Sequence, residues 1–122
     1  MIEFKKVGKI YPNGTKGLID VDLKIEQGEF VAIIGLSGSG KSTLMNIIGC
    51  LDKPTSGSFY LDGKDILKYK DNALSTVRLN TIGFVFQSFF LMMKQTALEN
   101  VCLPLTYAGI PKRKRKEIAA QA

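Results

Sequence analysis

The stretch from Phe30 to Cys50, FVAIIGLSGSGKSTLMNIIGC, constrains the fold more than any other part of the chain. It begins with a run of β-branched and aromatic residues, Phe30–Ile34, which is typical of a buried strand. A glycine-rich turn follows, and Lys41 and Ser42 then open a segment whose apolar residues have helical spacing. The pattern is G-x-x-x-x-G-K-[ST] between a strand and a helix, which predicts a phosphate-binding loop.

Each position of this loop suits a chain of phosphate groups. The glycines allow backbone conformations that bring N–H groups close to phosphate oxygens. The start of the following helix adds unpaired N–H donors, Lys41 adds a full charge, and the Ser42 hydroxyl is a hard ligand for Mg²⁺. We therefore expect ATP and Mg²⁺ here, in preference to an ordinary flexible Gly/Ser loop. The residues expected to contact the nucleotide are Gly35, Leu36, Ser37, Gly38, Ser39, Gly40, Lys41, Ser42 and Thr43.

Length and composition exclude several classes of protein. With 122 residues, the chain is one domain at most and is long enough for a hydrophobic core. No apolar run approaches the roughly 18–20 residues of a membrane span, and the N-terminus lacks a signal-peptide core, so we expect a cytoplasmic location. The chain has no histidine, which excludes His-based metal sites and Cys–His nucleophiles. Cys50 and Cys102 lack metal-ligand spacing and are interpreted as buried thiols that fill space.

The formal net charge of +6 could indicate a nucleic-acid or membrane partner. Five of the seventeen basic residues form one run, Lys112–Lys116, and the other twelve nearly balance eleven acidic residues. No aromatic residues are interleaved with this run, as would be typical of nucleic-acid binding. We interpret the run as the solvated start of a helix and expect no nucleic-acid partner, the alternative being a nuclear-localisation or nucleic-acid patch.

The residues before the phosphate loop predict an antiparallel sheet. Ile2–Val7 is a strand candidate, and Tyr11–Gly14 is a turn signal. Leu18–Ile25 alternates apolar with polar residues, which predicts a strand buried on one side only. The apolar side of that strand is expected to consist of Ile19, Val21, Leu23 and Ile25.

After the loop helix, Ser58–Leu61 and a tight turn at Asp62-Gly63 predict a hairpin. Tyr69–Leu79 is a helix candidate with several poor helix formers. Ile82–Phe86 is expected to be a second buried strand, and an apolar loop, Ser88–Lys94, follows it.

The last part of the chain predicts two helices. Thr96 and Glu99 form a capping-box pattern that opens a helix to about Leu103. Pro104 is expected to kink or end that helix, and Gly109 to cap its end. Pro111 opens the final helix, whose apolar face, Ile118 and Ala119, is expected to find nothing to pack against.

Four segments together carry a resemblance to a known family: GLSGSGKST, LDKPTSGSFYLDGKDI, IGFVFQ and TALENVCLPLTYAG. They resemble the nucleotide-binding domain of an ABC transporter, most of all the lipoprotein-releasing and macrolide-export type. The resemblance runs from Ile2 to Ala122 and covers the first half of such a domain. It implies an α/β fold: a P-loop NTPase (ABC ATPase) core with an N-terminal antiparallel β-subdomain, truncated before the signature segment and the acidic Mg-binding strand. The expected divisions are an antiparallel subdomain (1–29), a P-loop core (30–87) and the start of a helical subdomain (88–122).

The resemblance also implies roles for two residues outside the loop. Tyr11 matches an aromatic residue that stacks on adenine. Gln87 matches a glutamine that reaches Mg²⁺ or the attacking water, in a loop (Gln87–Lys94) that contacts a membrane permease. The exposed apolar residues Phe89–Met93 would then be a docking surface, although burial against the rest of the domain is an alternative. The segment SFFLMMKQT lacks the polar residue and the proline that are usual in this loop.

The implied function is that of the ATP-binding subunit of an ABC transporter, which dimerises with a second ATP-binding domain and lies at the inner face of the membrane through its permease. The signature segment, the acidic strand with its catalytic glutamate and the switch histidine would follow Ala122. We therefore expect this chain to bind nucleotide but hydrolyse it poorly, with Lys41 and Gln87 contributing to an incomplete catalytic site. Exposed apolar edges should also make the chain marginally stable or oligomeric. The alternatives are a non-transport ABC ATPase, for example of the cell-division type, and a non-hydrolysing remnant.

Overall fold

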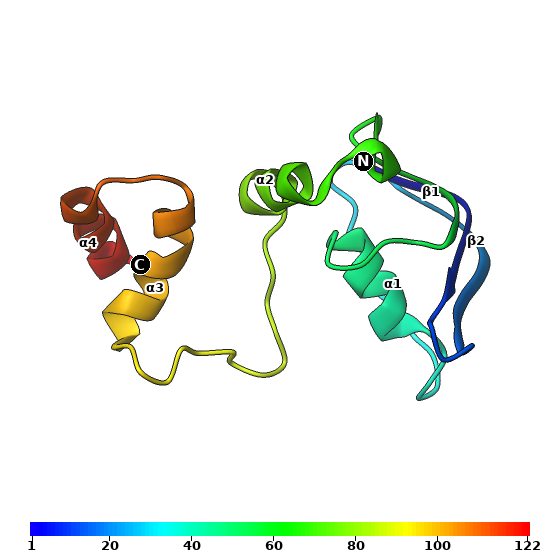
Figure 1. Cartoon of the computed structure of the whole chain (residues 1–122), viewed down its shortest axis with the longest axis horizontal. Helices are drawn as coiled ribbons and strands as arrows, with labels where there is room; N and C mark the ends of the chain where they lie inside the picture. Colours follow the sequence, from blue (N-terminus) through cyan, green and yellow to red (C-terminus); the bar gives the residue numbers. More distant parts are fainter. The chain divides into compact units, whose positions relative to one another are not determined.

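A computed structural model describes residues 1–122. The chain divides into two compact units, Met1–Arg78 and Leu79–Ala122, which are described separately (Figure 1). The finer division at residues 29 and 87 stays a prediction. None of the helices combines the length and the hydrophobicity that crossing a bilayer requires.

The first unit contains a four-stranded antiparallel sheet with the order β2-β1-β3-β4. The strands are β1 (Ile2–Ile10), β2 (Lys16–Ile25), β3 (Ser56–Leu61) and β4 (Lys64–Asp65). The expected turn at Tyr11–Gly14 is present, since the Gly14 N–H donates to the Tyr11 carbonyl at 2.8 Å. Asp62 and Gly63 both have positive φ, 48° and 74°, as a tight two-residue hairpin turn requires. The antiparallel sheet and the hairpin are thus confirmed.

The expected alternation along β2 is wrong at its first half. Leu18 is buried, whereas Ile19 is 67% exposed. Val7 pairs with Val21 and Lys9 with Leu18, so two steps along β1 correspond to three along β2. Asp20, at φ 45°, lies within this bulge. An extra residue reverses which side chains face the core, and period-two reasoning cannot detect that reversal.

The core of the first unit lies where the sheet meets helix α1 (Lys41–Ile48). Phe4 and Phe59 pair across β1 and β3, with ring centroids 4.7 Å apart in an edge-to-face arrangement. Ile47 of α1 has no exposed surface. Because hydrophobic burial fixes α1 against the sheet, it also fixes the loop that precedes the helix.

Two strands expected from apolar runs are absent. Phe30–Ile34 and Ile82–Phe86 have no regular secondary structure. Phe30 is 97% exposed, Ile34 92% and Val85 102%. A strand exists only through hydrogen bonds to a neighbour, and no segment of residues 1–122 pairs with either run. The expectation of two buried strands is therefore wrong for both runs.

The hairpin leads into a 3₁₀ turn, η1 (Ile66–Lys68), and then into helix α2 (Asp71–Thr81). The helix expected over Tyr69–Leu79 is therefore confirmed, and each of its ends is shifted by two residues. Arg78 of α2 donates from Nη1 to the Cys50 carbonyl at 2.9 Å. This contact joins α2 to the chain segment just after α1.

The second unit contains α3 (Ala97–Tyr107) and α4 (Lys112–Gln121), which pack against each other. The capping box of Thr96 and Glu99 is present in both directions. Gly109, at φ 73°, ends α3 in a Schellman arrangement, with Ile110 N–H donating to the Leu105 carbonyl.

Two expectations for these helices are corrected. Pro104 does not end α3, which continues to Tyr107. The face of α4 does not wholly lack a partner either: α4 packs on α3 and Ala119 is only 7% exposed, although Ile118 is 37% exposed. The sequence pattern identified an apolar face but could not identify the preceding helix as its partner.

Candidate functional site

The phosphate-loop motif spans Gly35–Ser42, and its last two residues open helix α1. Gly38 and Gly40 have φ values of 77° and 91°, so the chain uses the freedom that only glycine has without strain. A Cβ at Gly40 would lie 2.4 Å from the carbonyl oxygen of Gly17. Gly40 is also the N-cap of α1, and no side chain caps the helix. The first N–H groups of α1 therefore remain available to a ligand.

The Lys41 side chain folds back over the loop. Its Nζ donates to the carbonyls of Gly35 at 2.8 Å and Leu36 at 2.6 Å. Its third contact, to Ser39 Oγ, is longer, at 3.4 Å. The ammonium group thus joins the beginning of the loop to its end and concentrates positive charge beside the free N–H groups of α1. This arrangement suits an anion with several oxygens.

Tyr11, which follows strand β1, contacts Thr43 in the first turn of α1. The Tyr11 hydroxyl and Thr43 Oγ1 are hydrogen-bonded at 3.0 Å. Thr43 is only 8% exposed, and Tyr11 is half-buried. A Cβ at Gly17 would lie 2.9 Å from both side chains, so the lack of a side chain at Gly17 leaves them room to meet. The structure therefore groups Tyr11 with the loop, while its adenine-stacking role stays a prediction.

Ser42 carries the hydroxyl that the sequence predicts as a ligand of Mg²⁺. Ser42 is exposed, and its side chain makes no hydrogen bond within residues 1–122. Across the same residues no group of three His, Cys, Asp or Glu side chains could hold a metal ion. Within the loop, the Ser42 hydroxyl could hold a magnesium ion together with the oxygens of a bound phosphate chain, which is a usual arrangement for Mg²⁺.

Lys9 makes contacts beside the loop that were not predicted from the sequence. Lys9 is nearly buried, and its Nζ pairs with Asp52 and donates to the Lys53 carbonyl at 2.7 Å. The same Nζ lies 5.3 Å from the centroid of the Tyr11 ring, within cation–π range. Lys9 therefore links β1, the segment after α1 and Tyr11. The residues that it bonds, Asp52 and Lys53, lie more than 40 residues away in the sequence, so no local pattern indicated a role for Lys9.

The other expected site residues lie in the second unit. Gln87 is exposed in a bend and makes no hydrogen bond within residues 1–122. Around it, apolar side chains face solvent, among them Phe89 at 88% and Met93 at 91% exposed. The role of Gln87 at a metal ion or water stays a prediction.

Asn100 organises the end of this apolar loop and was also missed. Its Oδ1 accepts the Met92 N–H at 2.8 Å, and its Nδ2 donates to the Thr96 carbonyl at 3.0 Å. The side chain therefore ties Met92–Thr96 to the first turn of α3. An asparagine four residues after a capping threonine is the signal that could have identified it.

The two cysteines form no disulfide. Burial raises the pKa of the Cys50 thiol, and the nearby Arg78 charge offsets only part of this effect. A raised pKa keeps the thiol protonated and unreactive. Cys50 is thus a buried, space-filling residue, as expected.

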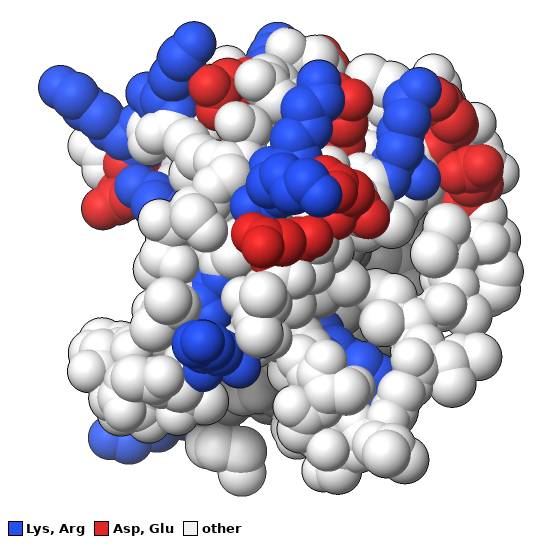
Figure 2. Space-filling view, turned by 90° about the vertical axis from the view of Figure 1, so that its right-hand side faces the viewer, with Lys and Arg blue, Asp and Glu red and all other residues white.

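Charge over the first unit is mixed in sign. On the face drawn in Figure 2, basic and acidic side chains lie side by side over the upper half. Ion pairs such as Lys6–Asp22 at 2.7 Å and Lys5–Glu3 at 3.2 Å belong to the sheet. Exposed pairs of this kind contribute little to stability.

Comparison with known proteins places these features in a family. The family model described as ABC transporter matches residues 18–122. The chain is 54% identical to the uncharacterized ABC transporter ATP-binding protein YknY of Bacillus subtilis, over all of this chain and 54% of that protein. It is 48% identical to the macrolide export ATP-binding/permease protein MacB 1/2 of Paracoccus denitrificans, over 95% of this chain and 18% of that protein.

Solved structures give the same result. A dimeric ATP-binding cassette, MJ0796, bound to ADP and Pi in a post-hydrolysis state, superposes with a TM-score of 0.90 at 46% identity. The match covers 99% of this chain and 55% of that one. A second dimeric structure of the same cassette gives a TM-score of 0.87. The chain therefore spans about half the length of the ATP-binding proteins and cassettes it matches.

Proposed function

Because the chain belongs to the ABC transporter family, as part of its ATP-binding domain, we propose that Gly35–Thr43 binds the phosphates of ATP to power a transporter. The observation that carries the proposal is the position of Lys41 Nζ. It is held at 2.6–2.8 Å from the carbonyls of Gly35 and Leu36, beside the uncapped start of α1. A mobile cation and several converging N–H donors are what a polyphosphate requires.

In this proposal each loop residue contacts a different part of the nucleotide. The N–H groups around Gly38 and Gly40 surround the phosphate chain, and the helix dipole adds to their field. Lys41 exchanges its weak contact with Ser39 for a phosphate oxygen and keeps its carbonyl contacts. Thr43 reaches the α-phosphate, and Tyr11, hydrogen-bonded to Thr43, presents its ring to adenine.

Magnesium would be held by Ser42, with Gln87 as a second oxygen ligand or as the group that orients water. When bound, the ion neutralises charge on the phosphates during phosphoryl transfer. Ser42 supports this role because its hydroxyl is exposed and makes no other hydrogen bond. For Gln87 the support is limited to two observations: the residue is exposed, and it directly follows the segment IGFVF.

Hydrolysis in this proposal requires residues beyond those of the loop. Residues 1–122 contain no LSGGQ-like run, no acidic strand that ends in Asp-Glu and no histidine. Different residues would therefore bind ATP and activate the attacking water, and residues 1–122 contain those that would bind ATP. Expressed alone, residues 1–122 should release phosphate no more than a few-fold faster than the Lys41→Ala variant.

The proposed partners are a membrane permease and a second ATP-binding domain. The segment Gln87–Lys94 would contact the permease, which would place the protein on the cytoplasmic face of the membrane. Exposed apolar residues in that segment support the idea, since large exposed apolar areas are typical of protein interfaces. The dimeric state of the MJ0796 cassette supports a second copy as the other partner.

Binding of a fluorescent ATP analogue, followed by anisotropy, tests the proposal. Lys41→Ala should weaken binding about tenfold or more, because a charge-assisted hydrogen bond contributes about 1.5–3 kcal/mol. Lys70→Ala is the matched control, because Lys70 is exposed in the same unit and forms no ion pair. Equal affinities of the two variants would show that the loop does not bind the nucleotide.

A further inference from the structure

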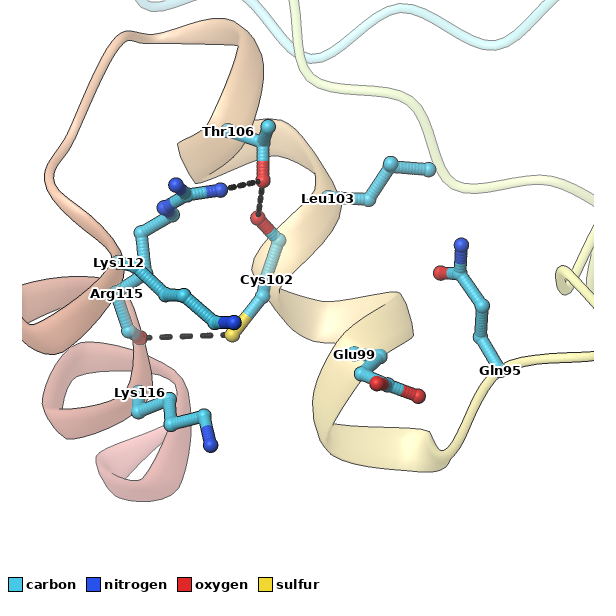
Figure 3. A pocket seen from close by; sticks show the side chains of 8 residues that line it. All are labelled: Gln95, Glu99, Cys102, Leu103, Thr106, Lys112, Arg115 and Lys116. Atoms are coloured by element: carbon cyan, nitrogen blue, oxygen red, sulfur yellow. Dashed lines mark hydrogen bonds between the residues drawn. The ribbon is translucent and has the colours of Figure 1, made fainter.

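A second cationic hollow lies within the second unit, between α3 and α4. It has a volume of about 340 Å³, at the small end of the range for ligand sites. Figure 3 shows that Lys112, Arg115 and Lys116 extend from α4 along this hollow, while Glu99 and Cys102 come from α3. None of these residues belongs to the phosphate loop.

None of the three cations of the hollow forms a close ion pair. Lys112 and Lys116 make no ion pair and no side-chain hydrogen bond within residues 1–122, whereas Arg113 on the same helix pairs with Glu117 at 3.9 Å. Arg115 donates from Nη1 to Thr106 Oγ1, but its buried Nε has no partner at all. A buried donor without an acceptor is costly, and a ligand acceptor would remove that cost.

Glu99 lines the same hollow and supplies part of the opposing negative charge: after its bonds to Thr96, the charges of Lys116 and Lys112 also lower the pKa of its carboxyl. Its Oε2 accepts the Thr96 N–H at 2.8 Å and the Thr96 hydroxyl at 2.9 Å, so the carboxylate is engaged in capping α3. The second unit carries six basic residues against two acidic ones. Four of those basic residues also occupy the first turn of α4, where the helix dipole disfavours cations. An anion in the hollow would offset this excess of positive charge.

We propose that this hollow binds a phosphate group, held by Lys112, Lys116 and the Arg115 guanidinium. Two ammonium groups and a guanidinium line the hollow, and such groups make strong, charge-assisted hydrogen bonds to phosphate oxygens. The site is independent of the nucleotide loop, which lies in the other unit. Its ligand is either free phosphate or the phosphate of an acidic lipid headgroup.

The test uses the full chain with Lys41→Ala, so that anions cannot bind at the phosphate loop. Inorganic phosphate is titrated, and binding is followed by ³¹P NMR line broadening and by the rise in melting temperature. Adding Lys112→Gln and Lys116→Gln should weaken phosphate binding about tenfold or more, because two charge-assisted contacts are lost.

The matched control adds Arg113→Gln and Lys114→Gln instead. These substitutions remove the same amount of charge from the same helix, but neither residue lines the hollow. The control should change phosphate affinity less than about twofold. Equal weakening by both pairs would mean that only the general charge of α4 attracts anions, and would overturn the site.

A second variant tests the Arg115 contact without loss of charge. Arg115→Lys keeps the cation but removes the guanidinium, with both its Nε donor and its Nη1 bond to Thr106, so phosphate affinity should fall. The melting temperature without phosphate measures separately what the loss of the Thr106 bond costs. Unchanged affinity would remove Arg115 from the site.

A vesicle arm separates the two sources of phosphate. Sedimentation with vesicles that contain phosphatidic acid, compared with pure phosphatidylcholine vesicles, should show binding that Lys112→Gln/Lys116→Gln abolishes if the headgroup is the ligand. If the protein binds free phosphate but not the vesicles, the ligand is the soluble anion. Absence of both kinds of binding overturns the proposal.

Discussion

The hydroxyl groups of Tyr11 and Thr43 are joined by a 3.0 Å hydrogen bond, although 32 residues separate them. Thr43 belongs to the first turn of α1, and Tyr11 follows strand β1. The bond therefore ties the start of the loop helix to the end of a strand in the sheet. It also joins in one pair the residue expected at the adenine ring and the residue expected at the α-phosphate.

This pair predicts non-additive effects of mutation. Tyr11→Phe and Thr43→Val each remove one partner, and each should lower the free energy of unfolding by about 1 kcal/mol. The double variant should lose clearly less than the sum of the two, as urea unfolding would measure. Tyr107→Phe, an exposed tyrosine whose hydroxyl makes no hydrogen bond, is the control and should have no effect. Strictly additive losses would mean that the bond contributes nothing.

Gly40 and Gly14 offer a matched comparison. Both have positive φ, 91° and 82°, but only at Gly40 would a Cβ collide with backbone, at 2.4 Å from the Gly17 carbonyl. Gly14→Ala should cost about 1 kcal/mol, the cost of a left-handed conformation. Gly40→Ala should cost more than Gly14→Ala and should also weaken nucleotide binding, because the loop must shift. Thermal unfolding and analogue binding measure both effects, and equal losses would contradict the predicted collision.

Glu99 gives α3 a pH dependence. The backbone N–H of Thr96, and then its hydroxyl, hold the pKa of this carboxyl below its usual value. The stabilisation is therefore fully present above the unfolded-state pKa of about 4.3 and is lost as the pH falls through the lowered, folded-state pKa. Circular dichroism between pH 6 and pH 2 should show loss of helix in this window. In Glu99→Gln, which retains an acceptor, that part of the pH dependence should disappear, and its persistence would assign the transition to another carboxyl.

Asn100 predicts the behaviour of the apolar loop. Removing its side chain in Asn100→Ala breaks the bonds to Met92 and Thr96. Amide hydrogen exchange over residues 88–96 should then become several-fold faster, while exchange in the sheet of the first unit stays unchanged. Asn80→Ala is a control, since Asn80 is exposed and makes no side-chain hydrogen bond. Equal exchange rates in both variants would mean that other contacts hold the loop.

Much of the fold could be predicted locally. The sheet strands, the hairpin turn at Asp62-Gly63 and the capping box at Thr96 each depend on residues close together in the sequence. The phosphate loop could be identified for the same reason, because its glycines, Lys41 and Ser42 are consecutive. Family resemblance then gave Tyr11 and Gln87 as candidates, and comparison confirmed the family but not these two roles.

The errors arise where the outcome depends on a distant partner. Phe30–Ile34 and Ile82–Phe86 have strand composition but find no strand to pair with. Ile19 was expected inward, yet a bulge at Asp20 turns it outward. Ala119 was expected to lack a partner, yet α4 folds back on α3.

The sequence alone predicts the loop: its glycines, a lysine and a hydroxyl follow one another in the order typical of phosphate-binding loops. The side chains around that loop are seen only in the folded chain: the Tyr11–Thr43 bond, the nearly buried Lys9 and the close approach of Gly17 to Gly40. Backbone conformation follows from neighbouring residues, whereas burial and hydrogen bonding depend on which distant segment packs alongside.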